Sequence, residues 1–411
     1  MSTTDKTLEV HPEESTQEPD PVSSETDNFK LDRILTVTLG HAIQDMYSSF
    51  LAPFLPVLIS NLSLSMTNAG LLAVFTRAPS LFQPVIGRLA DRVNLRYFFI
   101  LSPAVTATMM SLLGVAPSYV ILVILLIGAG ISTAALHAVG PVMAGKVSGG
   151  NVGRGMGFWT VGGEFGKTLG PILVVNGVTY LTLRGTPLLM IGGWLTSLVL
   201  FLQLRKIPGR PPERRAAGKW WPAFLSMRRV LLPVVGIGIT SSLMDAALTI
   251  YLPTFLTGEG VDLRMAGISL SILQVAGVLG SFSGGFLSDR LGRRMVIGFA
   301  MLSTPLFLFL FLQTAGLIQA AIIACMGLTL LSIQPVAMAI VYENFPENRA
   351  FANGIYMALG FGISSASALV LGALGDTFGL RQAFSVGGIM MLIGLPIVFL
   401  LPAGKSALSP D

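Results

Sequence analysis

Long apolar segments fill the chain from residue 33 to residue 402, and they restrict the fold more than any other feature. A helix needs about 20 mostly apolar residues to cross the hydrocarbon core of a bilayer. Twelve runs meet this length, at roughly 33–60, 68–90, 97–115, 118–146, 155–180, 186–204, 230–257, 265–288, 294–315, 317–344, 350–375 and 381–402. Only 11% of the 411 residues are charged, against about 25% in soluble domains. The sequence therefore predicts an all-α polytopic protein with twelve transmembrane helices in a lipid bilayer.

The polar segments around these runs divide the chain. Residues 1–32 hold nine acidic and two basic groups, and this composition predicts a disordered acidic tail. The stretch 205–229 is basic, proline-rich and placed midway along the chain. We therefore expect an N-terminal six-helix half at 33–204, a linker at 205–229, a C-terminal six-helix half at 230–402 and a short tail at 403–411.

The distribution of lysine and arginine predicts the orientation. If the N-terminus is cytoplasmic, the cytoplasmic loops and tails hold 21 of the 26 basic residues, and the opposite side holds only Arg184, Arg264 and Arg381. Positive residues concentrate on the cytoplasmic side of membrane proteins. We expect a multi-pass protein of the plasma membrane, the inner membrane in a bacterium, with both termini, the acidic tail and the linker in the cytoplasm.

The two predicted halves repeat each other. Asp45 and Pro53 in the first run recur 200 residues later as Asp245 and Pro253 in the seventh. The stretch GRLADRVNLR recurs as GGFLSDRLGRR, which aligns Asp91 with a second aspartate. A duplicated six-helix unit with pseudo-symmetric halves is a common architecture of secondary transporters.

The repeated loop carries a family resemblance, because it follows the pattern G-x-x-x-D-R-x-G-R-R. The second copy is complete, at Gly285, Asp289, Arg290, Gly292, Arg293 and Arg294. The first copy keeps Gly87, Asp91, Arg92 and Arg96, but has Asn94 and Leu95 where glycine and arginine are expected. The chain thus resembles the major facilitator superfamily, in which this element latches the two halves during transport. The alternative is a basic anchor that only sets topology.

Within that superfamily the first half is similar to the fosmidomycin-resistance family of efflux proteins. The matching stretches are HAIQDMYSSFLAPFLPVL, LFQPVIGRLAD, GISTAALHAVGPVMAGKVSGG and VGGEFGKTLGPIL. Ala138 stands where the family usually has proline, and Glu164 and Lys167 stand where it usually has uncharged residues. The resemblance implies efflux of a drug-like compound.

Five ionisable residues and one histidine fall at similar depth in the predicted spans. They are Asp45, Arg77, His137, Glu164, Lys167 and Asp245. From a helical rise of 1.5 Å per residue, these residues lie about 14–24 Å from the cytoplasmic boundary. A charge at this depth costs at least about 2.5–3.5 kcal/mol, so we expect it to face a cavity and to have a partner.

The two symmetry-related aspartates, Asp45 and Asp245, are candidate proton carriers, with hydrogen bonding between helices as the alternative. His41 lies four residues before Asp45 on the same helical face, where it either shares the proton or is solvated. Glu164 and Lys167 share a face of the fifth span. Glu164 is a further proton-coupling candidate and both are substrate-binding candidates, unless they only neutralise each other.

Arg77 has no neutralising residue nearby in the sequence, so it needs a carboxylate from another helix or an anionic ligand. It is our leading candidate for substrate contact. His137 corresponds by the repeat to Gln334, and either a ligand contact or a helix–helix hydrogen bond suits both residues. Gly166 and Gly170 predict a close helix approach.

These features favour proton-coupled export of a small amphiphilic or anionic compound by alternating access. Proton-coupled uptake of an organic anion and a non-transporting sensor or scaffold are the alternatives. No nucleophile lies beside a base, and no glycine-rich phosphate loop follows a strand, so we expect no enzyme, no cofactor and no nucleic-acid partner. The three histidines are too scattered in the sequence to predict a metal site. We expect a monomer that uses the proton gradient as its energy source.

Overall fold

The computed structural model describes residues 31–82, 95–148, 151–205, 220–345 and 349–402. Within these ranges every regular element is helical. Residues 1–30 of the predicted N-terminal tail, the predicted C-terminal tail, residues 206–219 of the predicted linker, and the motif residues Gly87, Asp91 and Arg92 lie outside the described residues. Leu31 and Asp32, which were predicted to belong to the disordered tail, are helical.

The first half consists of α1 (Leu31–Ser48), α2 (Leu51–Leu62), α3 (Met66–Arg77), η2 (Ala78–Phe82), α5 (Leu95–Ser111), η3 (Leu112–Val115), α6 (Tyr119–Val147), α7 (Val152–Gly185), η4 (Thr186–Leu189) and α8 (Met190–Leu204). The second half consists of α9 (Trp220–Ala246), the π-helical η5 (Ala247–Tyr251), α10 (Leu252–Gly258), α11 (Leu263–Leu291), α12 (Arg293–Phe311), α13 (Gly316–Leu330), α14 (Ile333–Asn344), α15 (Arg349–Phe378), α16 (Leu380–Ile393) and η6 (Leu395–Leu400). Helices satisfy their backbone polar groups internally, as the bilayer core requires.

Ten segments of the described chain are long and apolar enough to cross a membrane. One of them, Gly153–Leu204, contains both α7 and α8 and therefore covers two predicted spans. The second predicted span, 68–90, is described only as far as Phe82. Helix α9 already begins at Trp220, so residues 220–229 are helical although the sequence analysis assigned them to the linker.

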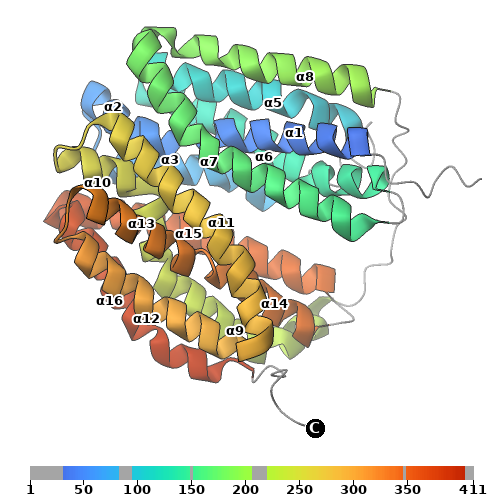
Figure 1. Cartoon of the computed structure of the whole chain (residues 1–411), viewed down its shortest axis with the longest axis vertical. Helices are drawn as coiled ribbons and strands as arrows, with labels where there is room; N and C mark the ends of the chain where they lie inside the picture. Colours follow the sequence, from blue (N-terminus) through green and yellow to red (C-terminus); the bar gives the residue numbers. More distant parts are fainter. Residues whose placement is uncertain (1–30, 83–94, 149–150, 206–219, 346–348, 403–411) are drawn as a thin grey trace, which may run out of the picture.

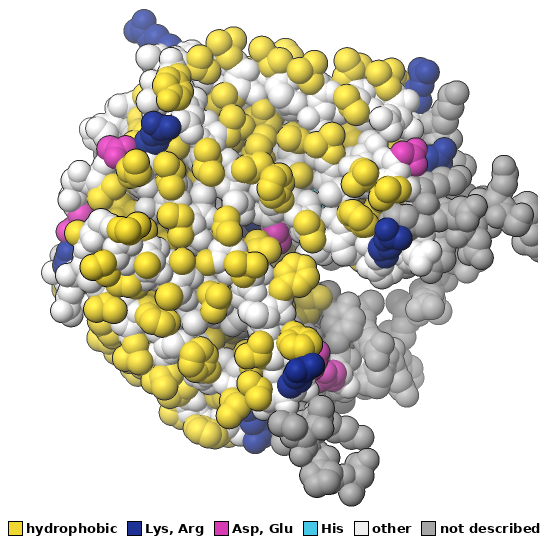
Figure 2. Space-filling view, viewed as in Figure 1, with side chains coloured by type: hydrophobic (Ala, Val, Ile, Leu, Met, Phe, Trp, Pro, Cys, Tyr) yellow, Lys and Arg dark blue, Asp and Glu magenta, His cyan; other side chains and the backbone are white. Residues whose placement is uncertain are grey.

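The exterior confirms the membrane environment. Large apolar side chains such as Leu232, Phe299 and Leu306 are exposed. In Figure 2 apolar side chains are spread over the middle of the visible face, while most charged side chains lie toward its edges. A soluble monomer does not expose apolar surface on this scale, whereas lipid covers it in a membrane.

The repeated aspartate and proline mark an equivalent break in the first span of each half. The first span divides into α1 and α2 between Asp45 and Pro53, and the seventh passes through η5 between Asp245 and Pro253. Proline has no N–H and cannot bond the carbonyl four residues earlier. The helix therefore loses regular bonding just after each aspartate, and the structure confirms the pseudo-symmetry of the two spans.

The halves meet at one end of the bundle. We call the end where α1 begins the inner end, and the end where α3 begins the outer end. Extensive contacts between the halves join α2, α3, η2 and α7 to η5, α10, α11 and α15. Helices α1 and α14 make their extensive contacts within their own halves. Figure 1 shows the halves converging near α2 and α10 and diverging toward the start of α1. The described residues of the two halves thus pack together at the outer end and lie apart at the inner end, and in this sense we call the inner end open.

Glycines on α7 allow it to lie directly against α1. A Cβ at Gly166 would lie 2.1 Å from the carbonyl oxygen of Ala42, and one at Gly170 would lie 2.2 Å from that of Met46. Neither distance is sterically possible, so only glycine permits this approach. The predicted close packing is confirmed, and it brings the charged residues of α7 next to Asp45.

Candidate functional site

Asp45 is the centre of a buried polar cluster. It lies near the end of α1 and is 1% exposed. Within the described part of the chain, neither of its carboxylate oxygens has a hydrogen-bond partner. Three residues lie beside it, namely His41 from α1, His137 from α6 and Lys167 from α7, and Glu164 of α7 is linked to it through Lys167. With Asp45 we call these four residues the Asp45 cluster. A buried carboxylate without hydrogen bonds is unstable as an anion unless nearby positive charge or a proton compensates it.

The protonation of His41 follows from its neighbours. Its Nδ1 lies 2.8 Å from the carbonyl oxygen of Trp159, which can only accept, so Nδ1 carries a hydrogen. The ring also stacks on the Trp159 indole, with centroids 3.6 Å apart. Its other nitrogen, Nε2, lies 3.4 Å from Oδ2 of Asp45. When His41 is neutral, a lone pair on Nε2 therefore faces the carboxylate, and a single proton on either group removes this repulsion.

The other three members of the cluster, His137, Lys167 and Glu164, bring further ionisable groups close to Asp45. His137 Nε2 lies 3.6 Å from Oδ1 of Asp45, and Lys167 Nζ lies 4.0 Å from Oδ2. Lys167 also donates to Oε1 of Glu164 at 2.8 Å. The side chains of His137, Lys167 and Glu164 are 33%, 41% and 34% exposed. The cluster thus has a sealed side at Asp45 and an accessible side at these three residues.

Two of the three histidines lie together in space, so the expectation that they are scattered was wrong. Ligand atoms of His41, Asp45 and His137 all lie within 4.8 Å of one another. The sequence could not reveal this, because α1 and α6 pack through tertiary contacts alone. The spacing suits a single metal ion. However, the ammonium group of Lys167 lies 4.0 Å from the same carboxylate and would repel a second cation, whereas it tolerates an exchangeable proton.

Arg77 belongs to a second group, which joins the two halves. It is the last residue of α3, and its Nη1 donates to the hydroxyl oxygen of Ser364 on α15. Its guanidinium also interacts electrostatically with the carboxylate of Asp245 on α9. The sequence predicted a carboxylate from another helix or an anionic ligand, and Asp245 is such a carboxylate. The symmetry-related aspartates therefore have different surroundings, because Asp45 faces histidines and a lysine within its own half.

Gln334 is not part of either group. It lies on α14 in the second half, with an exposed side chain, and no contact within the described residues assigns it a function. The charged residues predicted at similar depth thus divide into the Asp45 cluster and the Arg77–Asp245–Ser364 group.

Among the described latch residues, Arg293 and Arg294 make their hydrogen bonds and ion pairs within the second half. Arg293 contacts Oδ1 of Asp289 at 2.6 Å and Oε1 of Glu343 at 2.5 Å, all in the second half. Arg294 donates from Nε to the carbonyl oxygen of Leu401 at 2.7 Å. Two further arginines lie against rings: Arg290 over Phe286 and Arg96 over Tyr97. Gly285 has open space beside its Cα. These contacts accompany the open inner end, and the latch function stays a prediction.

Three residues that hold the clusters were missed in the sequence. Trp159 orients His41, Ser364 binds Arg77, and Gly163 leaves room for His41. A Cβ on Gly163 would lie 2.7 Å from Nε2 of His41 and 3.0 Å from Oδ2 of Asp45. The only sequence signal was the glycine-rich stretch of α7, read there as helix packing.

A helical membrane protein with two pseudo-symmetric halves, open at one end and holding buried charges between its helices, is a membrane transporter. The chain belongs to the Major Facilitator Superfamily: the sequence profile of this family matches residues 37–285 and 234–410. Members are carriers of small molecules and not enzymes, so the expected class is confirmed.

Curated relatives and solved structures agree with this assignment. The chain is 26% identical to the MFS-type transporter YfnC of Bacillus subtilis, over 90% of this chain and 93% of the relative. It is 25% identical to the fosmidomycin resistance protein of Escherichia coli, over 89% and 91%, and the predicted resemblance to that family is confirmed. A bacterial homologue of the human lysosomal transporter Spinster, in an inward-facing and occupied conformation, superposes with a TM-score of 0.76 at 17% identity, over 89% of this chain and 95% of that one. A D-xylose-proton symporter gives 0.70 at 15%, over 92% and 99%.

Proposed function

We propose that the protein is a proton-coupled exporter of a small amphiphilic or anionic compound that works by alternating access. It exchanges the compound for protons across the bacterial inner membrane, as a monomer with both termini in the cytoplasm. In this orientation the open inner end faces the cytoplasm, so the structure is in the state that loads cargo for export.

The observation that carries the proposal is the sealed carboxylate of Asp45. Its oxygens lie 3.4 Å and 3.6 Å from histidine nitrogens and accept no hydrogen bond. His41 Nδ1 is committed to the Trp159 carbonyl, so a proton added to His41 can only go to Nε2, which faces the carboxylate of Asp45. Asp45 and His41 therefore form one proton site, with Lys167 limiting its negative charge.

Antiport requires that binding of a proton and binding of the substrate weaken each other. The partly exposed side of the cluster, formed by His137, Glu164 and Lys167, is the surface that a substrate can reach. A compound that donates hydrogen bonds there binds best while the carboxylates are ionised, and adding a proton weakens that binding. Export then follows, because the proton gradient protonates the site from outside and releases the compound there.

The Arg77 group favours a second candidate, symport of an organic anion. An anion bound to Arg77 takes the place of Asp245, and a buried carboxylate that loses its cation binds a proton more readily. Anion and proton would then move together. The two candidates differ in the sign of the coupling, so one measurement separates them.

The test uses everted membrane vesicles that respiration acidifies inside, with an acridine dye reporting the pH gradient. Fosmidomycin is the first compound to test, because a relative is named for resistance to it. Antiport predicts that adding the compound outside restores dye fluorescence, as protons leave the lumen. If no compound in a panel of amphiphiles and organic anions dissipates the gradient, proton-coupled export is rejected. Symport is indicated if an anion loaded inside the vesicles leaves together with protons.

A further inference from the structure

The first turn of α3 is held by the opposite half of the protein. Both carboxylate oxygens of Asp376, near the end of α15, accept hydrogen bonds from it: Oδ1 from the backbone N–H of Met66 at 2.6 Å, and Oδ2 from the N–H of Thr67 at 2.8 Å. Oδ2 also accepts from the hydroxyl of Thr67 at 2.5 Å. The first N–H groups of a helix have no partner within it, and the helix dipole favours negative charge there. Asp376 thus caps a helix that lies about 310 residues earlier in the chain.

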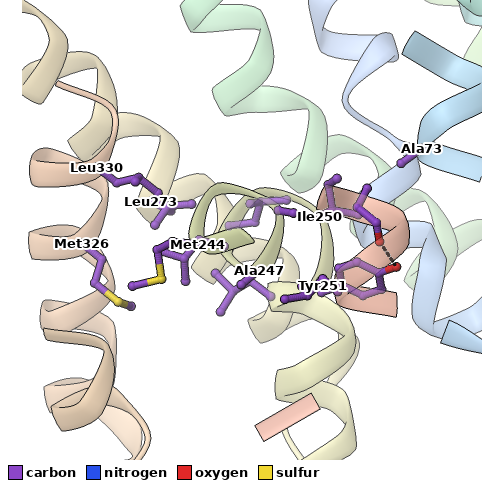
Figure 3. Packing of buried hydrophobic residues seen from close by; sticks show 14 of the residues in the cluster. Ala73, Met244, Ala247, Ile250, Tyr251, Leu273, Met326 and Leu330 are labelled. Atoms are coloured by element: carbon purple, nitrogen blue, oxygen red, sulfur yellow. Dashed lines mark hydrogen bonds between the residues drawn. The ribbon is translucent and has the colours of Figure 1, made fainter. Parts of the chain in front are cut away.

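A second contact, made by η5, closes the outer end at the first turn of α3. The hydroxyl of Tyr251, the last residue of η5, lies 2.9 Å from the carbonyl oxygen of Met66 and 3.0 Å from that of Ala368 on α15. Tyr251 is fully buried, and Figure 3 shows its hydroxyl hydrogen-bonded within the packed core. Its one hydroxyl hydrogen therefore bridges the two halves.

Helices α3 and α15 touch here through their backbones. A Cβ at Gly70 would lie 2.5 Å from the carbonyl oxygen of Ala368, and one at Gly372 would lie 2.4 Å from that of Met66. Only glycine allows such an approach, which leaves no space for water between the helices. The outer end is therefore sealed at this crossing.

Helices α3 and α15 and the segment η5 connect this crossing to the Arg77–Asp245–Ser364 group. Helix α3 begins at the seal and ends at Arg77, which binds Ser364 on α15. Asp245 directly precedes Ala246 and η5, and η5 ends at Tyr251. Short π-helical segments concentrate at functional sites, since they can shift by one residue. A displacement of α3 at one end is thus transmitted to the other along a helix of 12 residues.

We propose that Asp376, together with Tyr251, is the lock of the outer gate: the two side chains hold the first turn of α3 closed, and the gate opens outward only when Asp376 releases Met66 and Thr67. The lock does not depend on which substrate or ion is transported. It extends the proposed function by assigning the residues that limit the inward-to-outward transition.

The chain offers a matched control for this lock. Asp262 is also an exposed aspartate that caps a helix at the outer end, where it accepts from the N–H groups of Arg264 at 3.0 Å and Met265 at 3.1 Å. Its helix, α11, follows it directly in the same half. Asp262→Asn therefore makes the same change of side chain at a helix cap whose hydrogen bonds lie within one half.

The experiment measures how often the outer end opens. A reporter cysteine replaces Ala73, which is 3% exposed on α3 and lies about 9 Å inward of Thr67 by helical rise; Cys325, the single native cysteine, is changed to serine. Intact cells are treated with a charged maleimide that cannot cross the membrane. The labelling rate is proportional to the open fraction, so a rarely open gate is still measurable.

Asp376→Asn is expected to accelerate labelling about tenfold or more, because hydrogen bonds to a charged group contribute about 1.5–3 kcal/mol and each 1.4 kcal/mol is about tenfold. Tyr251→Phe should accelerate it about fivefold, and Asp262→Asn should leave it unchanged. If Asp376→Asn fails to fold, Thr67→Val tests the same lock by removing one of its three bonds.

An unchanged rate in the lock variants overturns the proposal, and so does an equal acceleration by Asp262→Asn, which would show general loosening of the outer end. The assay uses neither substrate nor proton gradient. A transporter that does not couple transport to protons could still have this lock and show the faster labelling. Failure of the proposed function and failure of the lock are therefore distinguishable.

Discussion

Gly163 on α7 gives the most direct steric test of the Asp45 cluster. In Gly163→Ala the new methyl carbon would lie 2.4 Å from Cε1 and 2.7 Å from Nε2 of His41, and 3.0 Å from Oδ2 of Asp45. His41 cannot move aside freely, because it stacks on Trp159 and bonds its carbonyl at 2.8 Å. Overpacking of this kind costs about 1–3 kcal/mol. Replacing a helical glycine by alanine stabilises by about 0.5–1 kcal/mol, so the expected net destabilisation is about 0–2.5 kcal/mol.

Gly157→Ala on the same helix is the matched control. No atom lies within 4 Å of a Cβ at this position, so only the gain in helix propensity remains, about 0.5–1 kcal/mol. Thermal unfolding in detergent should therefore show a lower apparent Tm for Gly163→Ala and a slightly higher one for Gly157→Ala. Gradient-driven transport should be lost only in Gly163→Ala. Normal transport and stability in that variant would refute the geometry of the cluster.

The remaining predictions concern the other charged contacts. Lys167→Met should reduce the yield of folded protein, measured by size-exclusion chromatography, because Glu164 loses its partner at 2.8 Å and an unpaired charge within a membrane span is costly; Glu164→Gln added to it should restore part of that yield. Arg77→Lys keeps the charge near Asp245 but loses the planar guanidinium that donates to Ser364, so the KM for transport should rise while folding is retained. Arg293→Ala should change the apparent Tm little, because its carboxylate partners are 64% and 50% exposed and such pairs contribute about 0–1 kcal/mol.

The sequence predicted the fold well, because the bilayer imposes it. Runs of about 20 apolar residues can only be spanning helices, and the repeat of Asp45 and Pro53 indicated two pseudo-symmetric halves. Asp45 and His41 were placed on the same helical face because they lie four residues apart, with a shared proton or a solvated histidine as the two alternatives. Their contact depends only on local helical geometry, and the structure shows it at 3.4 Å.

Contacts between helices could not be derived in the same way. His137 reaches Asp45 from a helix about 90 residues away in sequence, and nothing in its own segment indicates this. The sequence predicted that Arg77 needs a partner, but it did not identify Asp245 or Ser364. Both lie in the other half, so their positions relative to Arg77 depend on how the two halves pack together. The start of α9 at Trp220 was missed because proline and charge suggested a linker, although a helix can extend beyond the membrane.

The central claim is that Asp45 carries the proton that couples transport to the gradient, and a comparison of two modes of flux in proteoliposomes tests it most directly. Asp45→Asn keeps the size of the side chain but cannot gain or lose a proton. The account predicts that this variant still exchanges labelled substrate across the membrane at equal concentrations and pH, while a pH gradient no longer drives accumulation. Uphill accumulation by Asp45→Asn at the wild-type level would contradict the account.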